Sequence, residues 1–274
     1  MAASISSGTD GRRQPAEGVR STLPVEPAGA TLARPLENCS AGASALFRLL
    51  TWMSPAYPVG AYAYSGGIEW ATAAGDIADA VSLAGWLTSL LRHGTLFGDA
   101  VMFAQAHRAA AAGDAAALAE ISELAAALAG SKERFLETTS QGHAFIDITQ
   151  AAWPTVAFAK LAACWDGGNR GNRGCPIAYP VAAGAACGAH GIAASPALLA
   201  FLHGAASNLV SAGVRLIPLG QTDGQRVLAA LEAPIIQTAE RALTVAPDEW
   251  GTATLRAEVA AMRHETQYTR LFRS

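Results

Sequence analysis

The chain has 274 residues, a formal net charge of −3 and a pI of about 6.1, so we do not expect the basic surface that attracts nucleic acid. Hydrophobic residues make up 51% of the chain and charged residues only 15%, which excludes an intrinsically disordered protein and predicts a sizeable core. The apolar excess also suggests a surface that a second copy or an obligate partner covers. Neither lysine, Lys132 or Lys160, lies in the G-x-x-x-x-G-K-[ST] pattern of a Walker A phosphate loop.

Four cysteines are too few for a disulfide scaffold in a chain of this size. The N-terminus also has no continuous apolar run of the kind that predicts a signal peptide. We therefore expect a protein of the reducing cytoplasm.

Three segments differ in composition. Residues 1–42 contain four prolines and few large apolar residues, which predicts a disordered N-terminal tail. Residues 43–262 carry helical patterns and no series of alternating-polarity strands, so we predict one all-α, bundle-like domain. Residues 263–274 hold three arginines, one glutamate and a weak apolar pattern, which predicts a flexible C-terminal tail.

Helix signals in the first half of the domain come mainly from capping residues. Asp79, Asp114 and Ser131 each precede a helix-favouring run and can cap it through a side-chain oxygen. The predicted helices cover residues 80–91, 115–129 and 132–152. Their glutamates are expected on solvated helix faces, namely Glu120, Glu123, Glu133 and Glu137.

The second half of the domain contains a long uncharged stretch. Residues 174–214 include no Lys, Arg, Asp or Glu, and about 20 apolar residues suffice to cross a membrane. The stretch is rich in Ala and Gly, however, and is interrupted by prolines and histidines. We therefore predict buried helices of a soluble bundle and no membrane insertion.

Three further helices are expected in the second half, at about 195–209, 222–243 and 247–262. The first would begin with Ser195 as its cap and a proline in its first turn. The second would begin with the capping box that starts at Thr222.

The segment SPAYPVGAYAYSGGIE, residues 54–69, is the most unusual one, with prolines and glycines that predict a shaped turn. Ser65 is placed to cap the helix that follows, and Glu69 in the first turn suits the helix dipole. As an alternative, Ala63–Gly67 resembles the nucleophile elbow of a serine hydrolase, with Ser65 as nucleophile. That motif needs a preceding strand within a parallel sheet, and the other strands of such a sheet are not predicted.

A metal site is a weaker interpretation of four other residues. Cys187 and His190 are three positions apart, with Cys175 before them and His203 after them, and thiolate and imidazole suit zinc or nickel. No paired ligand motif is present, so buried cysteines and core histidines explain the pattern better. The remaining histidines, which include His264, are scattered and call for no special explanation.

Four segments together resemble the F-type urease accessory protein family, UreF, in the family's order and at similar spacing. They are LLTWMSPAYPVGAYAYSGGIEWA (49–71), SLAGWLTSLLRHG (82–94), NLVSAGVRLIPLGQTDGQRVL (208–228) and YTRLFRS (268–274). The family pattern PVGAFSYSxGLE is changed at three positions, to Tyr62, Ala63 and Ile68. The resemblance covers nearly all of residues 43–274.

The resemblance implies an all-α homodimer that matures urease and is not itself an enzyme. Members of the family join the accessory protein UreD, also called UreH, to the GTPase UreG. The complex acts on apo-urease during GTP-dependent nickel insertion, and GTP is bound by the partner, so no cofactor is expected here. A direct nickel-binding protein remains the alternative, and a hydrolase is the more distant one.

Two parts of the chain are implied as partner-binding sites. They are the turn, with Tyr62, Tyr64, Ser65 and Glu69, and the C-terminal tail, with Tyr268, Arg270, Leu271, Phe272 and Arg273. Aromatic and arginine residues are enriched among binding hot spots, which supports the choice. The alternatives are internal packing of the turn and a free, solvated tail. A flexible tail that does bind a partner would become ordered only on binding. Arg215 and Arg226 are further possible contacts.

Overall fold

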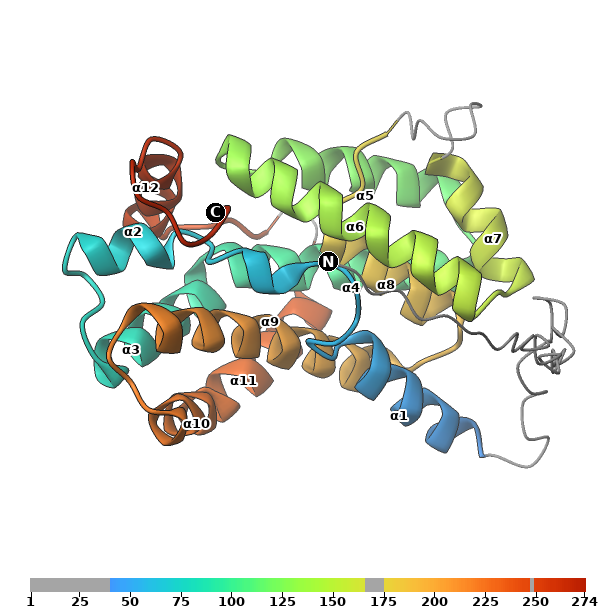
Figure 1. The fold of residues 1–274 in the computed structure, drawn as a ribbon. Coiled ribbons are helices and arrows are strands. Elements are labelled where there is room, and N and C mark those ends of the chain that lie inside the picture. The colour runs from blue at the N-terminus through green and yellow to red at the C-terminus, as the bar shows by residue number, and fades with distance from the viewer. Residues whose placement is uncertain (1–39, 166–174, 247–248) are drawn as a thin grey trace, which may run out of the picture. The chain divides into compact units, whose positions relative to one another are not determined.

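The computed structural model describes residues 40–165, 175–246 and 249–274. Within these residues the chain is helical and contains no strand, which confirms the predicted all-α class (Figure 1). The helices are α1 (Ala41–Trp52), η1 (Ala61–Ala63), α2 (Ile68–Ala73), α3 (Ala80–His93), α4 (Thr95–Ala112), α5 (Ala115–Ala127), α6 (Lys132–Ala152), α7 (Val156–Ala162), η2 (Ala163–Trp165), α8 (Tyr179–Ala189), α9 (Ala194–Leu216), α10 (Gln221–Ala230), α11 (Glu232–Thr244) and α12 (Leu255–His264), where η marks a 3-10 helix. The predicted N-terminal tail lies outside the described residues up to position 39.

The three predicted caps are confirmed in the first half of the domain. Asp79 accepts the backbone N–H of Ser82 at 2.8 Å, Asp114 accepts that of Ala117 at 2.9 Å, and Ser131 caps α6 in the same way. Each side chain satisfies an N–H that has no partner within its own helix. These starts are therefore set by residues within one turn of the cap.

Two helix starts in the second half differ from the prediction. Ser195 is not a cap, because α9 begins at Ala194 and continues seven residues beyond the predicted end, to Leu216. Thr222 is not a cap either, because α10 begins at Gln221 with Gly220 at the N-cap position, and the predicted helix over 222–243 is two helices, α10 and α11, which are separated at Leu231.

The last helix begins at Leu255, later than the predicted start at Pro247, which itself lies outside the described residues. The residues before it contact two other helices, α3 and α4. The N–H of Ala253 donates to the carbonyl of His93 at 2.7 Å, and the ring of Trp250 meets Phe97 edge-on. These tertiary contacts compete with the local helix signal and delay the start.

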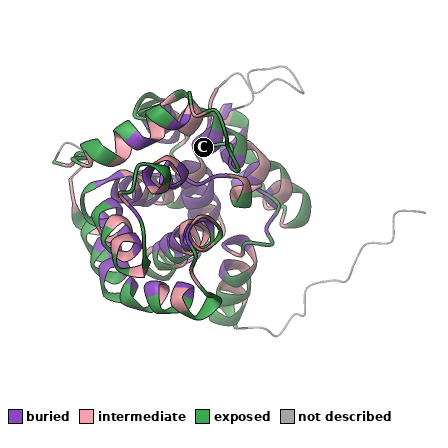
Figure 2. Ribbon diagram, turned by 60° about the vertical axis from the view of Figure 1, so that its left-hand side comes forward, coloured by how far each residue is buried: buried purple, intermediate pink, exposed green. Residues whose placement is uncertain are grey.

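The core is centred on α4, α8 and α9, and Figure 2 shows the buried residues gathered on helices inside the bundle. Helix α8 buries nine of its eleven residues. At Gly184 and Gly188 the backbone of α8 lies so close to carbonyls of α4 that a Cβ would overlap them. Small residues thus explain why an uncharged stretch builds closely packed helices here.

Helix α9 is, among the described residues, a helix long and apolar enough to cross a membrane by length and composition. In the structure it packs against α2, α3, α4, α8, α10 and α11. Its apolar residues Leu198, Phe201 and Leu202 are buried in these contacts. The helix therefore has the packing of a core helix in a bundle.

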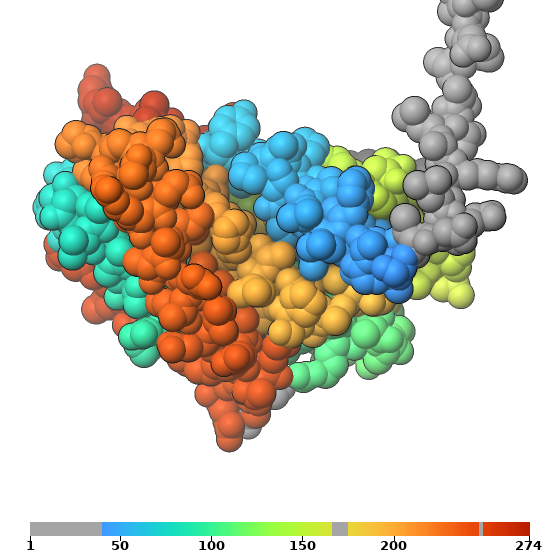
Figure 3. Space-filling model, turned by 90° about the horizontal axis from the view of Figure 1, so that it is seen from below, coloured from blue at the N-terminus to red at the C-terminus, as the bar shows by residue number. Residues whose placement is uncertain are grey.

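Helix α1 lies at the surface beside α9 (Figure 3). Three of its apolar side chains, Leu46, Phe47 and Leu50, are more than half exposed. This is the kind of uncovered apolar surface that the composition predicts.

Candidate partner-binding site

The turn before α2 depends on glycines. Gly60 and Gly67 have φ values of 75° and 82°, which residues with a Cβ rarely adopt. At Gly67 a Cβ would also lie only 2.8 Å from the backbone nitrogen of Ala261 in α12. Gly67 therefore lets α12 pack directly against the start of α2.

Ser65 does not occupy the N-cap position of α2, which belongs to Gly67. Its Oγ accepts a long hydrogen bond from the N–H of Glu69, at 3.4 Å, and donates to the carbonyl of Ser274. The segment before it is a 3-10 helix, not a strand. The nucleophile elbow is therefore wrong, because its strand and sheet are absent from the described residues.

Residues 265–274, called the C-terminal segment below, are packed against this turn, where the sequence predicts a flexible tail. The N–H of Arg273 donates to the carbonyl of Ala63 at 2.8 Å, and the N–H of Ser65 donates to that of Ser274 at 2.7 Å. The ring of Phe272 is buried. These backbone bonds give the segment partners that composition alone cannot reveal.

The carboxylate of Glu69 is the main anchor of the C-terminal segment. It accepts the backbone N–H of Leu271 at 2.6 Å and that of Phe272 at 2.9 Å, and it lies 3.1 Å from Nε2 of His264. Burial alone would raise the pKa of Glu69, but the hydrogen bonds from Leu271, His264 and Phe272 lower it below the ordinary value. Glu69 is therefore held as a carboxylate that organises the segment around it.

His264 extends this anchor to α6. Its Nδ1 lies 2.7 Å from Oε2 of Glu133, and the other oxygen of Glu133 accepts Arg270 Nη1 at 2.6 Å. The His264 side chain is fully buried, and that of Glu133 is only 12% exposed. The expectation that Glu133 lies on a solvated face is wrong, because α12 and the C-terminal segment cover that face of α6.

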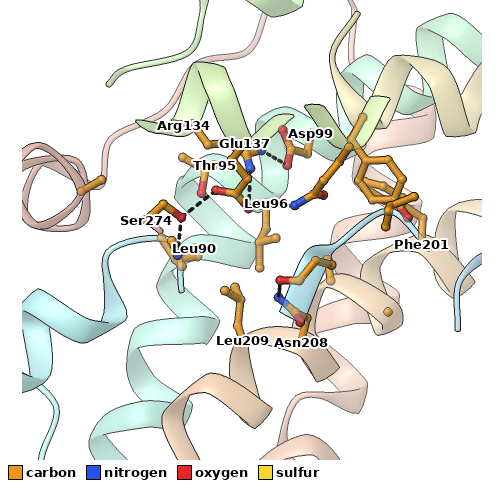
Figure 4. Close-up of a pocket in the computed structure, with 18 of the residues that line it drawn as sticks. Leu90, Thr95, Leu96, Asp99, Arg134, Glu137, Phe201, Asn208, Leu209 and Ser274 are labelled. Carbon is orange, nitrogen blue, oxygen red and sulfur yellow. Dashed lines mark hydrogen bonds and ion pairs between the residues drawn. The ribbon is translucent and has the colours of Figure 1, made fainter. Parts of the chain in front are cut away.

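A second charged cluster lies one turn further along α6. Arg134 pairs with Asp99 of α4 and lies 3.5 Å from Glu137, whose other oxygen accepts the hydroxyl of Ser274 at 3.1 Å (Figure 4). Burial raises the pKa of Glu137 although Arg134 opposes it. Glu137 is thus also buried, contrary to the predicted solvated face.

These residues line a cavity of about 130 Å³ between α3, α4, α6 and α9. Figure 4 shows the charged groups on one side and the apolar side chains of Leu90, Leu209 and Phe201 around them. Ser274 forms part of the wall, so the C-terminal segment closes one side of the cavity.

The predicted site residues divide into a buried set and an exposed set. Tyr64, Ser65, Glu69 and Phe272 are buried and hold the turn and the segment together. The exposed set consists of Tyr62, Tyr268, Arg270, Leu271 and Arg273. Only the exposed set is available to a partner in this conformation.

Arg215 joins the two parts of the exposed surface. Its guanidinium lies 4.3 Å from the centre of the Phe272 ring and donates to the carbonyl of Tyr62 at 3.1 Å. A cation over an aromatic face is a favourable contact. Arg226, the other possible contact, pairs instead with Asp223 at 2.8 Å on α10.

The weak metal candidates do not form a metal centre within the described residues, where no three His, Cys, Asp or Glu side chains are grouped to hold an ion. Cys187 is buried, and burial raises the pKa of its thiol, which disfavours the thiolate. Both ring nitrogens of His190 lie within 3.0 Å of backbone carbonyls, those of Ala186 and Trp153. His203 is exposed on α9.

Sequence reasoning missed His264 and Glu133 as parts of the site. Glu133 and Glu137 are four residues apart and share one face of α6, a spacing that predicts a common surface but not what covers it. His264 gives no local signal at all.

Comparisons with known proteins agree with the resemblance found in the sequence. The UreF family profile matches residues 77–232. A urease accessory protein UreF from Rhodopseudomonas palustris strain HaA2 is 54% identical over 233 residues, which are 85% of this chain and 94% of that protein. Proteins of the same name from Bradyrhizobium diazoefficiens and from Rhodopseudomonas palustris strain TIE-1 are 54% and 55% identical, over 85% and 84% of this chain and 93% of each relative.

Proposed function

The chain belongs to the UreF family of urease accessory proteins, and we propose that it is a non-enzymatic subunit of the complex that matures urease. In this proposal it joins UreD/UreH to the GTPase UreG and regulates GTP-dependent nickel insertion into apo-urease in the cytoplasm. The identity shared with urease accessory proteins over most of the chain is the observation that carries the proposal.

The exposed set on the turn and the C-terminal segment supports a role in binding partners. Tyr62 is 70% exposed, Leu271 is 66% exposed, and Tyr268 is fully exposed. Exposure of large aromatic and aliphatic side chains to water is unfavourable, so a partner that covers them would gain free energy. Arg273 adds a cation beside them. Aromatic side chains and arginines are frequent hot spots, so we assign this surface to a partner subunit.

A homodimer is the second part of the proposal. The exposed side chains of Leu46, Phe47 and Leu50 on α1 are its support in the structure, because covering them in a second copy would remove apolar area from water. Sedimentation of the purified chain tests this part, and a monomer at all accessible concentrations would contradict it.

The two alternatives have less support. Within the part of the chain that the structure describes, direct nickel binding lacks a ligand set, and the hydrolase lacks the sheet that its nucleophile elbow requires. Neither is proposed.

The test is urease activity in cells that contain nickel, the urease subunits and the other accessory proteins, with and without this chain. We expect activity only with it, and equal activity in its absence would contradict the proposal. Arg273→Ala should weaken co-purification of the partner proteins, whereas Arg92→Ala, an exposed arginine on α3, should not. Arg270 is less suitable for this purpose, because it also pairs with Glu133.

A further inference from the structure

His264 lies at the centre of a buried cluster, and the protonation state of its ring decides how many of its neighbours it can donate a hydrogen bond to. One ring nitrogen lies 3.1 Å from Glu69 and the other 2.7 Å from Glu133, and the side chain has no exposed surface. A neutral imidazole has one N–H, so it can donate to one carboxylate and must direct a lone pair at the other. Only the imidazolium donates to both.

The charge balance of the cluster leads to the same conclusion. Glu69 and Glu133 contribute two negative charges, and Arg270 contributes one positive charge through Glu133. With a charged His264 the four groups are neutral together, whereas with a neutral His264 a net negative charge is left in a largely buried site. Burying an uncompensated charge is costly.

Other charged groups on the helices that pack around His264 do not supply the positive charge that its imidazolium brings to the cluster. On α6, Lys132 is exposed, and Arg134 is engaged with Asp99 and Glu137. Glu69 is the one ionisable side chain of α2. On the histidine's own side of the cluster, Arg263 is exposed, and Glu265 accepts the backbone N–H of Lys132 at 2.8 Å.

The same carboxylates that face His264 hold the C-terminal segment. Glu69 accepts the N–H groups of Leu271 and Phe272, and Glu133 accepts Arg270. We propose that His264 is a proton-dependent latch: its imidazolium keeps Glu69 and Glu133 in place, and loss of its proton releases the C-terminal segment from its docked geometry. The consequence for partner binding rests on the proposed function, because the segment carries the predicted partner contacts.

The sign of the pH effect follows from the two kinds of group. The imidazolium is the form that donates to both carboxylates, so the contribution of His264 is present while the ring is charged and is lost when a rise in pH removes the proton. The carboxylates set the acid limit. Hydrogen bonds lower the pKa of Glu69 below its ordinary value, so the contribution of Glu69 is lost only as the pH falls through that lowered value.

Amide hydrogen exchange at Leu271 and Phe272 tests the latch in the purified full chain, after correction for the intrinsic pH dependence of exchange. In the wild-type protein we expect protection at these two amides to fall about 10-fold or more between about pH 5 and pH 8. His264→Gln should have low protection and no such fall. His93→Gln, an exposed histidine on α3, should behave as the wild type does.

A wild-type profile that is flat over this range would overturn the proposal, and so would a wild-type fall that persists in His264→Gln. If that variant does not fold, Glu133→Gln takes its place, since it removes one of the two acceptor charges and should reduce the fall. A full wild-type fall in Glu133→Gln would overturn the proposal as well. No partner is present in this experiment, so failure of the latch leaves the urease test of the proposed function untouched.

Discussion

Replacement of Glu69 by glutamine tests whether one carboxylate docks the C-terminal segment. The two carboxylate oxygens of Glu69 face three donors, at 2.6, 2.9 and 3.1 Å. Glutamine has only one acceptor oxygen there, and its NH₂ group, itself a donor, would face the donors that this oxygen does not bond. A hydrogen bond to a charged group contributes about 1.5–3 kcal/mol, and a buried donor without a partner costs about 1–3 kcal/mol. We therefore expect docking to weaken by about 3 kcal/mol, or about 100-fold in the undocked population.

Tryptic cleavage after Arg270 measures that population, because the protease needs an undocked backbone and cleavage follows the open fraction when opening is fast. The rate, followed by mass spectrometry in native buffer, should rise about 100-fold in Glu69→Gln. Glu120→Gln makes the same chemical change on an exposed face of α5 and should cleave at the wild-type rate. Equal rates in the two variants would refute the reasoning.

The pH dependence of this effect has a definite sign. Because the pKa of Glu69 is lowered in the folded protein, its stabilising contribution is fully present above the ordinary pKa of glutamate and is lost as the pH falls through the lowered value. The difference between the wild type and Glu69→Gln should therefore shrink as the pH falls through that lowered value. Hydrogen exchange is the suitable measurement there, because trypsin is inactive in acid.

Two further substitutions test the packing around the site by urea unfolding. Gly67→Ala should destabilise the protein by about 2–4 kcal/mol, because alanine disfavours φ near +82° and its Cβ would meet the α12 backbone, whereas Gly85→Ala, in open space on α3, should stabilise it by up to about 1 kcal/mol. Tyr57→Phe should cost about 1–2 kcal/mol, since it removes a buried 2.7 Å hydrogen bond to Thr149, while Tyr268→Phe at a fully exposed position should change stability by less than about 0.5 kcal/mol. Equal effects within either pair would contradict the packing argument.

The sequence predicts the helices best where the signal and its partner lie within one turn. Asp79, Asp114 and Ser131 bond to N–H groups three residues away, so the chain itself contains both halves of each cap. Ser195 has the same local preference, but a cap is worth only about 1 kcal/mol. In the structure α9 begins at Ala194 with Ala193 at the N-cap position, so Ser195 lies in the first turn and is not the cap.

The site is predicted less completely for the converse reason. Glu69 and His264 are 195 positions apart, and Glu133 and His264 are 131 apart, so no spacing rule connects them. Each acid also has a sufficient local explanation, the helix dipole for Glu69 and a solvated face for Glu133. Only the convergence of α2, α6 and α12 shows that these groups share one histidine.

A docked C-terminal segment changes the energetics of partner binding from what a free tail would give. Fixing the backbone of one residue costs about 1–2 kcal/mol of conformational entropy. A tail that becomes ordered on binding therefore binds more weakly by about that amount for each residue that becomes fixed. Here the backbone N–H groups of Leu271 and Phe272 already donate to Glu69, and that of Arg273 donates to the carbonyl of Ala63. A partner that binds the exposed side chains therefore meets an ordered surface. Under the proposed function, the buried anchor therefore contributes to partner affinity without touching the partner. Glu69→Gln should weaken partner binding once the docked fraction falls below about one half, since apparent affinity scales with that fraction.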